Sequence, residues 1–475
     1  MRPLSGGVSY SIVHNVRENV NHAVRAENAV CHGNLLFWAA AYHISKNRRE
    51  GEEFMIIRYP SFYKSFHCTA SACLDTCCAG WNIHIDRKSL ENYQSQKGSF
   101  GRKLRKEINP KTSCFKMEGR RCRMLTEEGL CTIQQNLGEA SLCQTCRIYP
   151  RHMEAYPGRR EYMLMLSCPE AARMMLTRKE SMIFREKHVQ EREKTPRGHL
   201  QEKHLKEKES QKYWQLSEVP EIQEALEEAS REEGELLEAL CRVRKTVEAF
   251  LTDRAELPEQ RISMVLALCH DVQNQIGKYE TEKIEEVCEK FEKGRERLKK
   301  QITEDMAGGQ MGNMHRETRK ELQTGYLQLL DAWEPVTDTW PDFYEEYLKK
   351  LEQTEEKTYR QERKAFEKQW RENFQEAAEQ LAVAFQFTYL LGACYDRNLW
   401  GKAVLTAYSY LIIKELCFGI YLDGGTCQMT DLIETTHLYS RECEHSDRNL
   451  EILEELFKDR TLFSMERLLY ALGED

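Results

Sequence analysis

The chain has 475 residues, of which 41% are hydrophobic and 31% charged, and its formal net charge is −8. That length suffices for two or three domains with a sizeable core. No segment reaches the roughly 18 uninterrupted apolar residues of a membrane span, and the N-terminus lacks the order of a signal peptide. We therefore expect no membrane partner and a cytoplasmic location.

Residues 1–54 differ in composition from the rest of the chain and show neither a clear period nor a metal-binding pattern. A new composition begins at Met55, with the sequence Met-Ile-Ile-Arg-Tyr-Pro. We expect residues 1–54 to be a poorly ordered leader, or an extension from a mis-called start.

Residues 55–175 carry 19 Lys and Arg against 11 Asp and Glu, whereas residues 176–475 carry 44 against 61. The basic excess has three possible uses: to balance thiolates, to attract an acidic ligand, or to contact the acidic part of the chain. Nucleic acid is an unlikely partner, because the whole chain is acidic and its aromatic and basic residues are little interleaved.

Cysteine is the most informative residue in this basic stretch. Of the 18 cysteines in the chain, ten lie between Cys68 and Cys168 inclusive. In a long chain without an export signal, such density favours metal binding over disulfides. The spacing does not match the Cys-x3-Cys-x2-Cys of radical enzymes that cleave S-adenosylmethionine, because Gly80 stands where the third cysteine would be. Thiolates from distant segments suit zinc or an iron–sulfur cluster. The ligands we predict are Cys73, Cys77, Cys78, Cys122, Cys131, Cys143 and Cys146.

The other cysteines are less informative. Cys68, Cys114 and Cys168 fit a ligand or a structural role equally well. The remaining eight stand singly and fit small buried hydrophobes. They are Cys31, Cys241, Cys269, Cys288, Cys394, Cys417, Cys427 and Cys443.

Beyond the cysteine-rich region, residues 185–212 are almost wholly polar and predict a linker or insertion. Residues 213–475 then show apolar residues at helical spacing. Helices are predicted over 221–250, 262–302, 322–333, 343–351, 356–394, 401–419, 427–439, 446–457 and 464–472. Ser446 or Asp447 is a natural N-cap. The predicted fold is mainly α, a helical body with a small irregular cysteine-rich metal-binding module (55–175) near the N-terminus.

Several segments resemble the flagellin lysine-N-methylase family. These are residues 59–68, 73–86, 129–139, 142–151 and 166–173, together with a closing motif at 438–450. The resemblance implies a methyltransferase that transfers a methyl group from S-adenosylmethionine to lysine side chains of flagellin and involves a [4Fe–4S] cluster. No glycine-rich nucleotide loop after a strand is visible, so we expect a cluster to help hold S-adenosylmethionine.

Lysine must lose a proton before it attacks a methyl group, so the reaction needs a base. The closing motif contains a dense titratable group: Tyr439, Glu442, Glu444, His445 and Asp447. From it we select Tyr439, Glu442, His445 and Asp447 as catalytic candidates. The structural alternative is a helix junction capped by Asp447.

Three residues after the Cys-x2-Cys pair, Arg147, Tyr149 and Arg151, are candidates for cofactor binding. They suit hydrogen bonds to sulfur or pairing with a carboxylate, and the arginines equally suit neutralising a cluster's charge. The rival function is a non-enzymatic zinc-binding cysteine module that mediates protein or nucleic-acid contacts.

Overall fold

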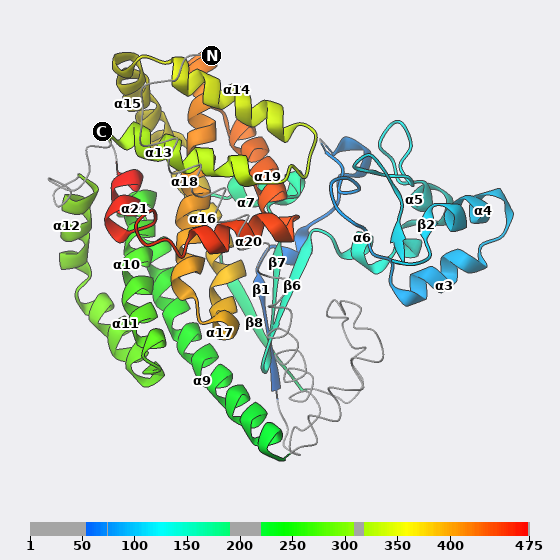
Figure 1. The fold of residues 1–475 in the computed structure, drawn as a ribbon, viewed down its shortest axis with the longest axis horizontal. Coiled ribbons are helices and arrows are strands. Elements are labelled where there is room, and N and C mark those ends of the chain that lie inside the picture. Colours follow the sequence, from blue (N-terminus) through cyan, green and yellow to red (C-terminus); the bar gives the residue numbers. More distant parts are fainter. Residues whose placement is uncertain (1–53, 74, 191–219, 308–317, 474–475) are drawn as a thin grey trace.

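A computed structural model describes residues 54–73, 75–190, 220–307 and 318–473. Helices dominate these residues, which confirms the prediction of a mainly α fold. The predicted leader lies outside the described residues except for Phe54, and Cys31 lies outside them as well. Figure 1 shows a large helical body on one side, a smaller cysteine-rich part on the other and a sheet between them.

The helical body is built from the C-terminal half of the chain. Its α-helices are α9 (Pro220–Leu251), α10 (Pro258–Gly277), α11 (Ile284–Lys293), α12 (Arg295–Met306), α13 (Arg319–Gln328), α14 (Trp340–Gln353), α15 (Glu356–Asn373), α16 (Gln375–Tyr389), α17 (Ala393–Asp396), α18 (Leu399–Gly424), α19 (Met429–Glu444), α20 (Asp447–Leu456) and α21 (Met465–Leu472).

Helix α18 lies at the centre of this body, where α10, α13, α14, α16 and α19 pack against it. It is apolar on all sides, as expected of a helix that is surrounded by others. Among the described helices, α18 is the one whose length and composition would allow a membrane span, and 94% of its apolar window is buried inside the protein. A core helix of a globular protein has the same properties, so α18 gives only weak support for a membrane span.

Two long predicted helices are interrupted in the structure. The run over 262–302 forms α10, α11 and α12, with breaks next to Gly277 and Gly294. The run over 356–394 breaks at Phe374, whose backbone leaves the helical region between α15 and α16. Apolar periodicity continues across these short turns, so spacing alone did not reveal them. Of the two predicted caps, Ser446 is confirmed, because it accepts a hydrogen bond from the Asn449 amide, whereas Asp447 is the first residue of α20.

A four-stranded sheet was not predicted. Its strands run in the order β6 (Arg151–Tyr156), β7 (Arg159–Leu164), β1 (Phe54–Pro60) and β8 (Phe184–Gln190). Strand β1 pairs parallel with β7 and antiparallel with β8. The predicted polar linker over 185–212 is therefore corrected at 185–190, which form most of β8. Charged side chains are common on an edge strand such as β8, because they discourage pairing with another chain.

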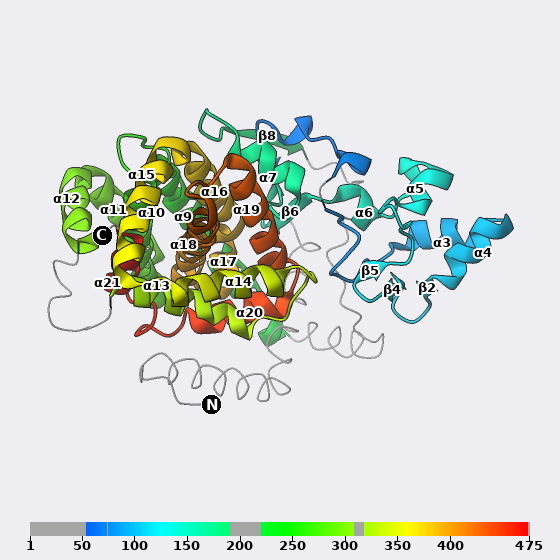
Figure 2. The ribbon, with the colours of Figure 1, turned by 90° about the horizontal axis from the view of Figure 1, so that it is seen from above.

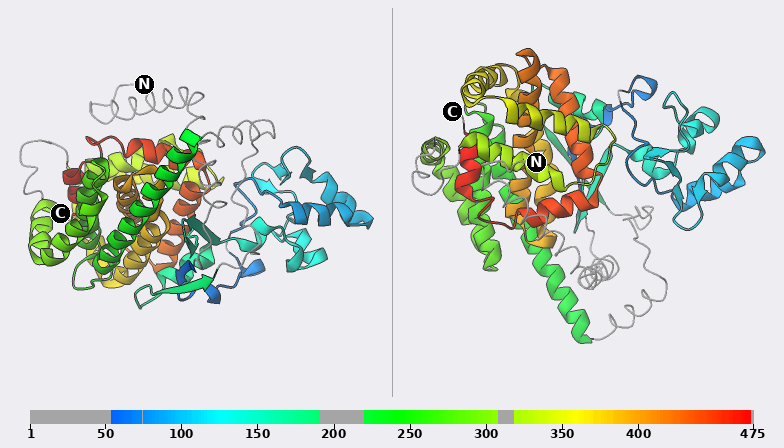
Figure 3. Two further views of the ribbon diagram at one scale, coloured as in Figure 1. Left: turned by 90° about the horizontal axis from the view of Figure 1, so that it is seen from below. Right: turned by 45° about the horizontal axis from the view of Figure 1, so that its top comes forward.

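The cysteine-rich part contains short elements and a small core of its own. Its helices are α3 (Arg87–Ser95), α4 (Gly98–Lys106), α5 (Thr132–Leu137) and α6 (Gln144–Ile148), and its two-residue strands are β2 (Ile108–Asn109), β3 (Cys114–Phe115), β4 (Met117–Glu118) and β5 (Arg121–Cys122). Its buried core, with Tyr93 and Leu104 at its centre, is separate from the core of the helical body. Figures 2 and 3 show from other directions that this part projects from one end of the body.

Candidate functional site

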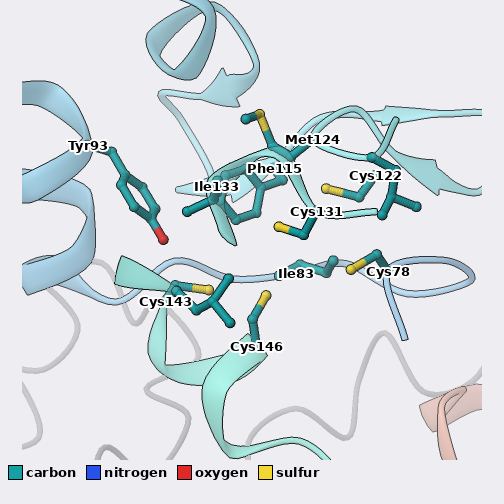
Figure 4. Close-up of a pocket in the computed structure, with 12 residues that line it drawn as sticks. Cys78, Ile83, Tyr93, Phe115, Cys122, Met124, Cys131, Ile133, Cys143 and Cys146 are labelled. Carbon is teal, nitrogen blue, oxygen red and sulfur yellow. The ribbon is translucent and has the colours of Figure 1, made fainter. Parts of the chain in front are cut away.

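Five of the seven predicted ligand cysteines line one cavity in the cysteine-rich part. They are Cys78, Cys122, Cys131, Cys143 and Cys146. Figure 4 shows their sulfur atoms pointing toward a common space, with Tyr93 at its edge. They come from the loop before Trp81, from β5 and from the starts of α5 and α6, so the fold brings together cysteines that are far apart in sequence.

The two other predicted ligands lie beside this cavity. Cys77 is not among the residues that line it, although its thiol hydrogen-bonds with that of Cys78. Cys73 is a neighbour of Cys68, and negative charge at Cys73 and Cys77 adds to the burial that raises the pKa of Cys168 to about 12. Cys68, Cys73, Cys77 and Cys168 thus form a second, looser group of sulfurs.

The thiols of the cavity influence one another's ionisation. The hydrogen bond from Cys146 lowers the pKa of Cys143, while the same bond and burial raise the pKa of Cys146. Burial raises the pKa of Cys122 to about 11. A thiol must lose its proton before it can bind a metal, so metal binding here would release several protons.

The donors fit a thiolate-bound metal or cluster in their chemistry. Every described cysteine is a free thiol, and soft sulfur donors in an apolar cavity suit zinc or iron–sulfur clusters. Among the residues that the structure describes, however, no three Cys, His, Asp or Glu side chains already stand in a geometry that holds a metal ion.

The loop that carries Cys77 and Cys78 is held against α19 of the helical body. His437 forms two hydrogen bonds: Nδ1 lies 2.7 Å from the Ser167 carbonyl oxygen, and Nε2 lies 2.9 Å from the Asp75 carboxylate. Arg441 donates to the same carboxylate and to the carbonyls of Thr76 (2.6 Å) and Ala79 (2.7 Å). These contacts connect the cysteine cavity with the helical body.

Gly80 allows the same loop to approach the body closely. Its φ is +83°, and a Cβ placed there would lie 2.7 Å from Cγ1 of Val336. A larger residue would be strained by its backbone and would also clash. The position that argued against radical chemistry is therefore occupied by glycine for a structural reason.

Three of the four predicted catalytic residues, Tyr439, Glu442 and Asp447, are not brought together at one site. Tyr439 is fully buried and shares a 3.0 Å hydrogen bond with Ser409. Glu442 accepts hydrogen bonds from the amides of Val336 (2.5 Å) and Thr337 (2.7 Å), so it holds a loop in place. Asp447 is exposed in the first turn of α20.

The fourth candidate, His445, lies where the two parts of the protein meet. Its Nε2 contacts the Ser167 hydroxyl at 2.8 Å, and its ring packs edge-on against Trp81 and Tyr149. Burial, with help from the nearby charge of Arg441, lowers the pKa of His445 to about 3. His445 is therefore neutral at pH 7.

The three predicted cofactor-binding residues are not brought together. Tyr149 packs beside His445, and its hydroxyl lies 3.3 Å from that of Ser167. Arg147 is exposed at the end of α6. Arg151 donates to the Phe66 carbonyl and lies over the Phe66 ring, so it packs the chain leading to the cysteines.

A second cavity lies between the β6–β7 hairpin and helices α16 and α19. His152 and Glu444 line it together with apolar residues of β7 and α16. Tyr389 donates a 2.8 Å hydrogen bond to Oε1 of Glu444, and burial raises the pKa of Glu444 to about 7. The sequence offered Glu444 only as one member of the closing motif, and nothing in it pointed to His152.

The model of the FliB lysine N-methylase C-terminal domain matches residues 244–471. The flagellar biosynthetic protein FliU of Salmonella muenchen is 32% identical over 137 residues, which are 27% of this chain and 81% of that protein. The chain belongs to the flagellin lysine-N-methylase family.

Lysine-N-methylases of Salmonella typhimurium and Salmonella choleraesuis are also 32% identical, over 139 residues that make up 27% of this chain and 35% of each relative. The chain thus spans about a third of the length of these two relatives. No solved structure matches the chain.

The matched C-terminal domain of this lysine-N-methylase family member begins within α9 and ends in α21. It contains α16 and α19, and therefore Tyr389, His437, Arg441 and Glu444. The cysteine cavity lies before it in sequence. The contacts of α19 with residues 75–79 join this family domain to the cysteine-rich part.

Proposed function

We propose that the chain is a cytoplasmic enzyme that methylates lysine side chains of flagellin with S-adenosylmethionine as the methyl donor. Membership of the lysine-N-methylase family carries this proposal. The relative named as a flagellar biosynthetic protein supports flagellin as the substrate.

The reaction requires a neutral lysine amine aligned with the methyl group of a sulfonium ion. The amine's lone pair forms the new N–C bond, while the C–S bond breaks and its electron pair stays on sulfur. The protein must therefore remove a proton from lysine, exclude water and hold both reactants in line. The last turns of α19 suit this work, because Arg441 contacts the loop that carries Cys77 and Cys78 and Glu444 lines the second cavity.

We further propose that the thiols of the cysteine cavity hold a [4Fe–4S] cluster, for which zinc is the alternative. The five cysteines that line the cavity exceed the four that a cluster needs. When bound, a cluster with one open iron site would supply a place for the amino and carboxylate groups of the methyl donor. Trp81 packs against the core of the cysteine-rich part and edge-on against His445 of the helical body.

Methyl transfer is tested by incubating the purified protein and S-adenosylmethionine with flagellin. Mass spectrometry of flagellin peptides is expected to show lysines that are heavier by whole methyl groups. A reaction without S-adenosylmethionine is the control. Unmodified lysines after incubation with metal-loaded protein would refute the proposal.

Metal content tests the cluster separately. Protein purified without oxygen is expected to be brown and to contain iron, and Cys146→Ser is expected to lose most of it. Cys241→Ala, which removes a half-buried thiol from α9, is the matched control and should keep the wild-type iron content. Colourless protein with stoichiometric zinc would contradict the cluster and favour the zinc alternative.

A further inference from the structure

Helix α4 of the cysteine-rich part carries a row of exposed basic side chains. Residues 97–116, which contain this helix, hold seven Lys or Arg and one Asp or Glu. The buried residues of α4 are Gly101 and Leu104, which pack toward the small core. The side of the helix opposite them carries three exposed basic residues, here called the basic face: Arg102, Lys103 and Lys106.

Two neighbouring basic side chains have partners within the chain, whereas the basic face has none. Arg105 donates to the carbonyls of Gln94 (3.0 Å) and Gln96 (2.7 Å), and Lys116 donates to the Lys106 carbonyl (2.6 Å). The side chains of the basic face make no hydrogen bond or ion pair with any residue that the structure describes. Their charges are therefore available to a partner.

The absence of acidic neighbours is unlike the arrangement in the helical body. There, exposed basic residues pair with glutamates one turn away, as Lys293 does with Glu289 and Arg360 with Glu356. Helix α4 contains no Asp or Glu at all. Its basic face instead places like charges three and four residues apart, which disfavours a helix.

The helix dipole explains only part of this row. Lys103 and Lys106 lie in the last turn of α4, where positive charge is favourable, but Arg102 lies before that turn. A residue pattern that opposes its own local structure is typical of a position that serves an interaction. The basic face therefore has a use outside the helix.

The position of α4 excludes two uses of the basic excess within the chain. No residue of α4 lines the cysteine cavity, and exposed charges are screened by water and salt, so the basic face does not balance the thiolates. Figures 1 and 2 show α4 at the end of the cysteine-rich part that points away from the helical body. The basic face thus does not contact the acidic body, and an acidic ligand remains.

The surroundings of the basic face indicate the kind of acidic ligand. Among the described residues, the exposed large hydrophobic side chains are Ile148, Ile183, Val189 and Tyr279, and none of them belongs to α3 or α4. Single-stranded nucleic acids stack on exposed aromatic rings, and a helix bound to a membrane inserts apolar side chains. An acidic peptide needs neither, because its carboxylates bind arginine and lysine directly.

We propose that the basic face binds an acidic segment of the protein whose lysine is methylated. This inference rests on the proposed methyl transfer and names a feature by which the enzyme recognises its protein substrate. A contact remote from the reacting lysine keeps that lysine near the site of reaction, so it lowers KM with little effect on kcat. Attraction between opposite charges also speeds the first encounter.

Binding of a short fluorescent poly-L-glutamate peptide tests the basic face without methyl transfer. Fluorescence anisotropy at low salt is expected to show binding to the wild type, and added NaCl should weaken it. The triple variant Arg102→Gln, Lys103→Gln, Lys106→Gln should bind at least about tenfold more weakly. Equal binding of poly-L-glutamate to the wild type and this variant would overturn the proposal.

A matched triple variant controls for the loss of net charge. Arg297, Lys300 and Lys364 are exposed on α12 and α15 of the helical body, and their replacement by glutamine removes the same number of positive charges. This control should bind poly-L-glutamate as the wild type does. An equal loss of binding in the control would overturn the proposal, because the effect would then follow net charge and not the basic face.

Competition distinguishes an acidic peptide from other polyanions. A single-stranded DNA oligonucleotide and vesicles that contain phosphatidylserine should displace poly-L-glutamate poorly. Tighter binding of the DNA, lost in the basic-face variant, would overturn the proposal in favour of nucleic acid. Tighter binding of the vesicles, lost in the same way, would overturn it in favour of a membrane surface.

Kinetics test whether the acidic segment belongs to the substrate. The basic-face variant is expected to raise KM for flagellin by at least about tenfold and to change kcat by less than about twofold. A short neutral peptide that contains lysine should be methylated equally by the variant and the wild type. Methylation with an unchanged KM for flagellin would overturn the inference and leave the proposed reaction intact. Poly-L-glutamate binding that depends on the basic face, in a protein that methylates no flagellin, would do the reverse.

Discussion

Replacement of Arg441 by alanine is expected to lower the free energy of unfolding by about 3–5 kcal/mol. Arg441 is only 1% exposed, and it donates to the Asp75 carboxylate and to the carbonyls of Thr76 and Ala79. Its removal leaves the carbonyls of Thr76 and Ala79 without this donor and opens a void beside α19, while Asp75 keeps its contact with His437. The loss should be felt most in residues 75–79, which carry the cysteine pair Cys77–Cys78.

Urea unfolding measures the change, and hydrogen exchange of residues 75–79 locates it. Arg448→Ala is the matched control, since Arg448 is exposed on α20 and should change stability by less than about 0.5 kcal/mol. Arg441→Ala is also expected to bind less metal, because the loop with Cys78 loses its support. Stability within about 1 kcal/mol of wild type would show that the guanidinium does not hold the two parts together.

Glu444→Gln is expected to stabilise the protein at pH 8 by up to about 3 kcal/mol. Burial raises the pKa of Glu444 from 4.5 to about 7 in the folded protein. Between these values the folded state binds the proton more tightly than the unfolded state. The free energy of unfolding of the wild type therefore falls as pH rises from 4.5 to 7. Glutamine does not titrate, so the variant does not show this fall.

The measurement is the free energy of unfolding of wild type and Glu444→Gln across this pH range. The two proteins should differ little near pH 4.5, and the difference should grow until about pH 7. Glu442→Gln is the contrast, because Glu442 is fully bonded to the 336–337 loop and its replacement should destabilise the protein. A loss of stability at pH 8 in Glu444→Gln would contradict the argument.

The cysteine spacing alone predicted a thiol-lined site, and five of the seven chosen cysteines share one cavity. The fold brings these cysteines together because they belong to, or pack against, one small apolar core. Spacing did not separate Cys78, which lines the cavity, from Cys77, which does not. Which sulfurs bind metal stays a prediction.

The sequence motif located a polar region but did not show which of its residues are already hydrogen-bonded within the protein. The closing motif drew attention to the end of α19, but Tyr439 and Glu442 prove to be bonded within the body. Glu444 differs from them only through its neighbours: Tyr389 on α16 and His152 on β6. These neighbours are distant in sequence, so no local sequence pattern predicts that they lie beside Glu444.

The sequence by itself determined the helical body and the concentration of thiols, and it narrowed the cap of α20 to Ser446 or Asp447, because helix periodicity, capping and residue chemistry act over a few neighbouring residues. Only the tertiary structure decided that residues 185–190 complete a sheet with β1, that Gly80 lies against Val336, and that Glu444 faces an apolar cavity. Each of these depends on contacts between segments far apart in the chain. Such contacts set burial, and burial sets the charge and the hydrogen bonds of a site.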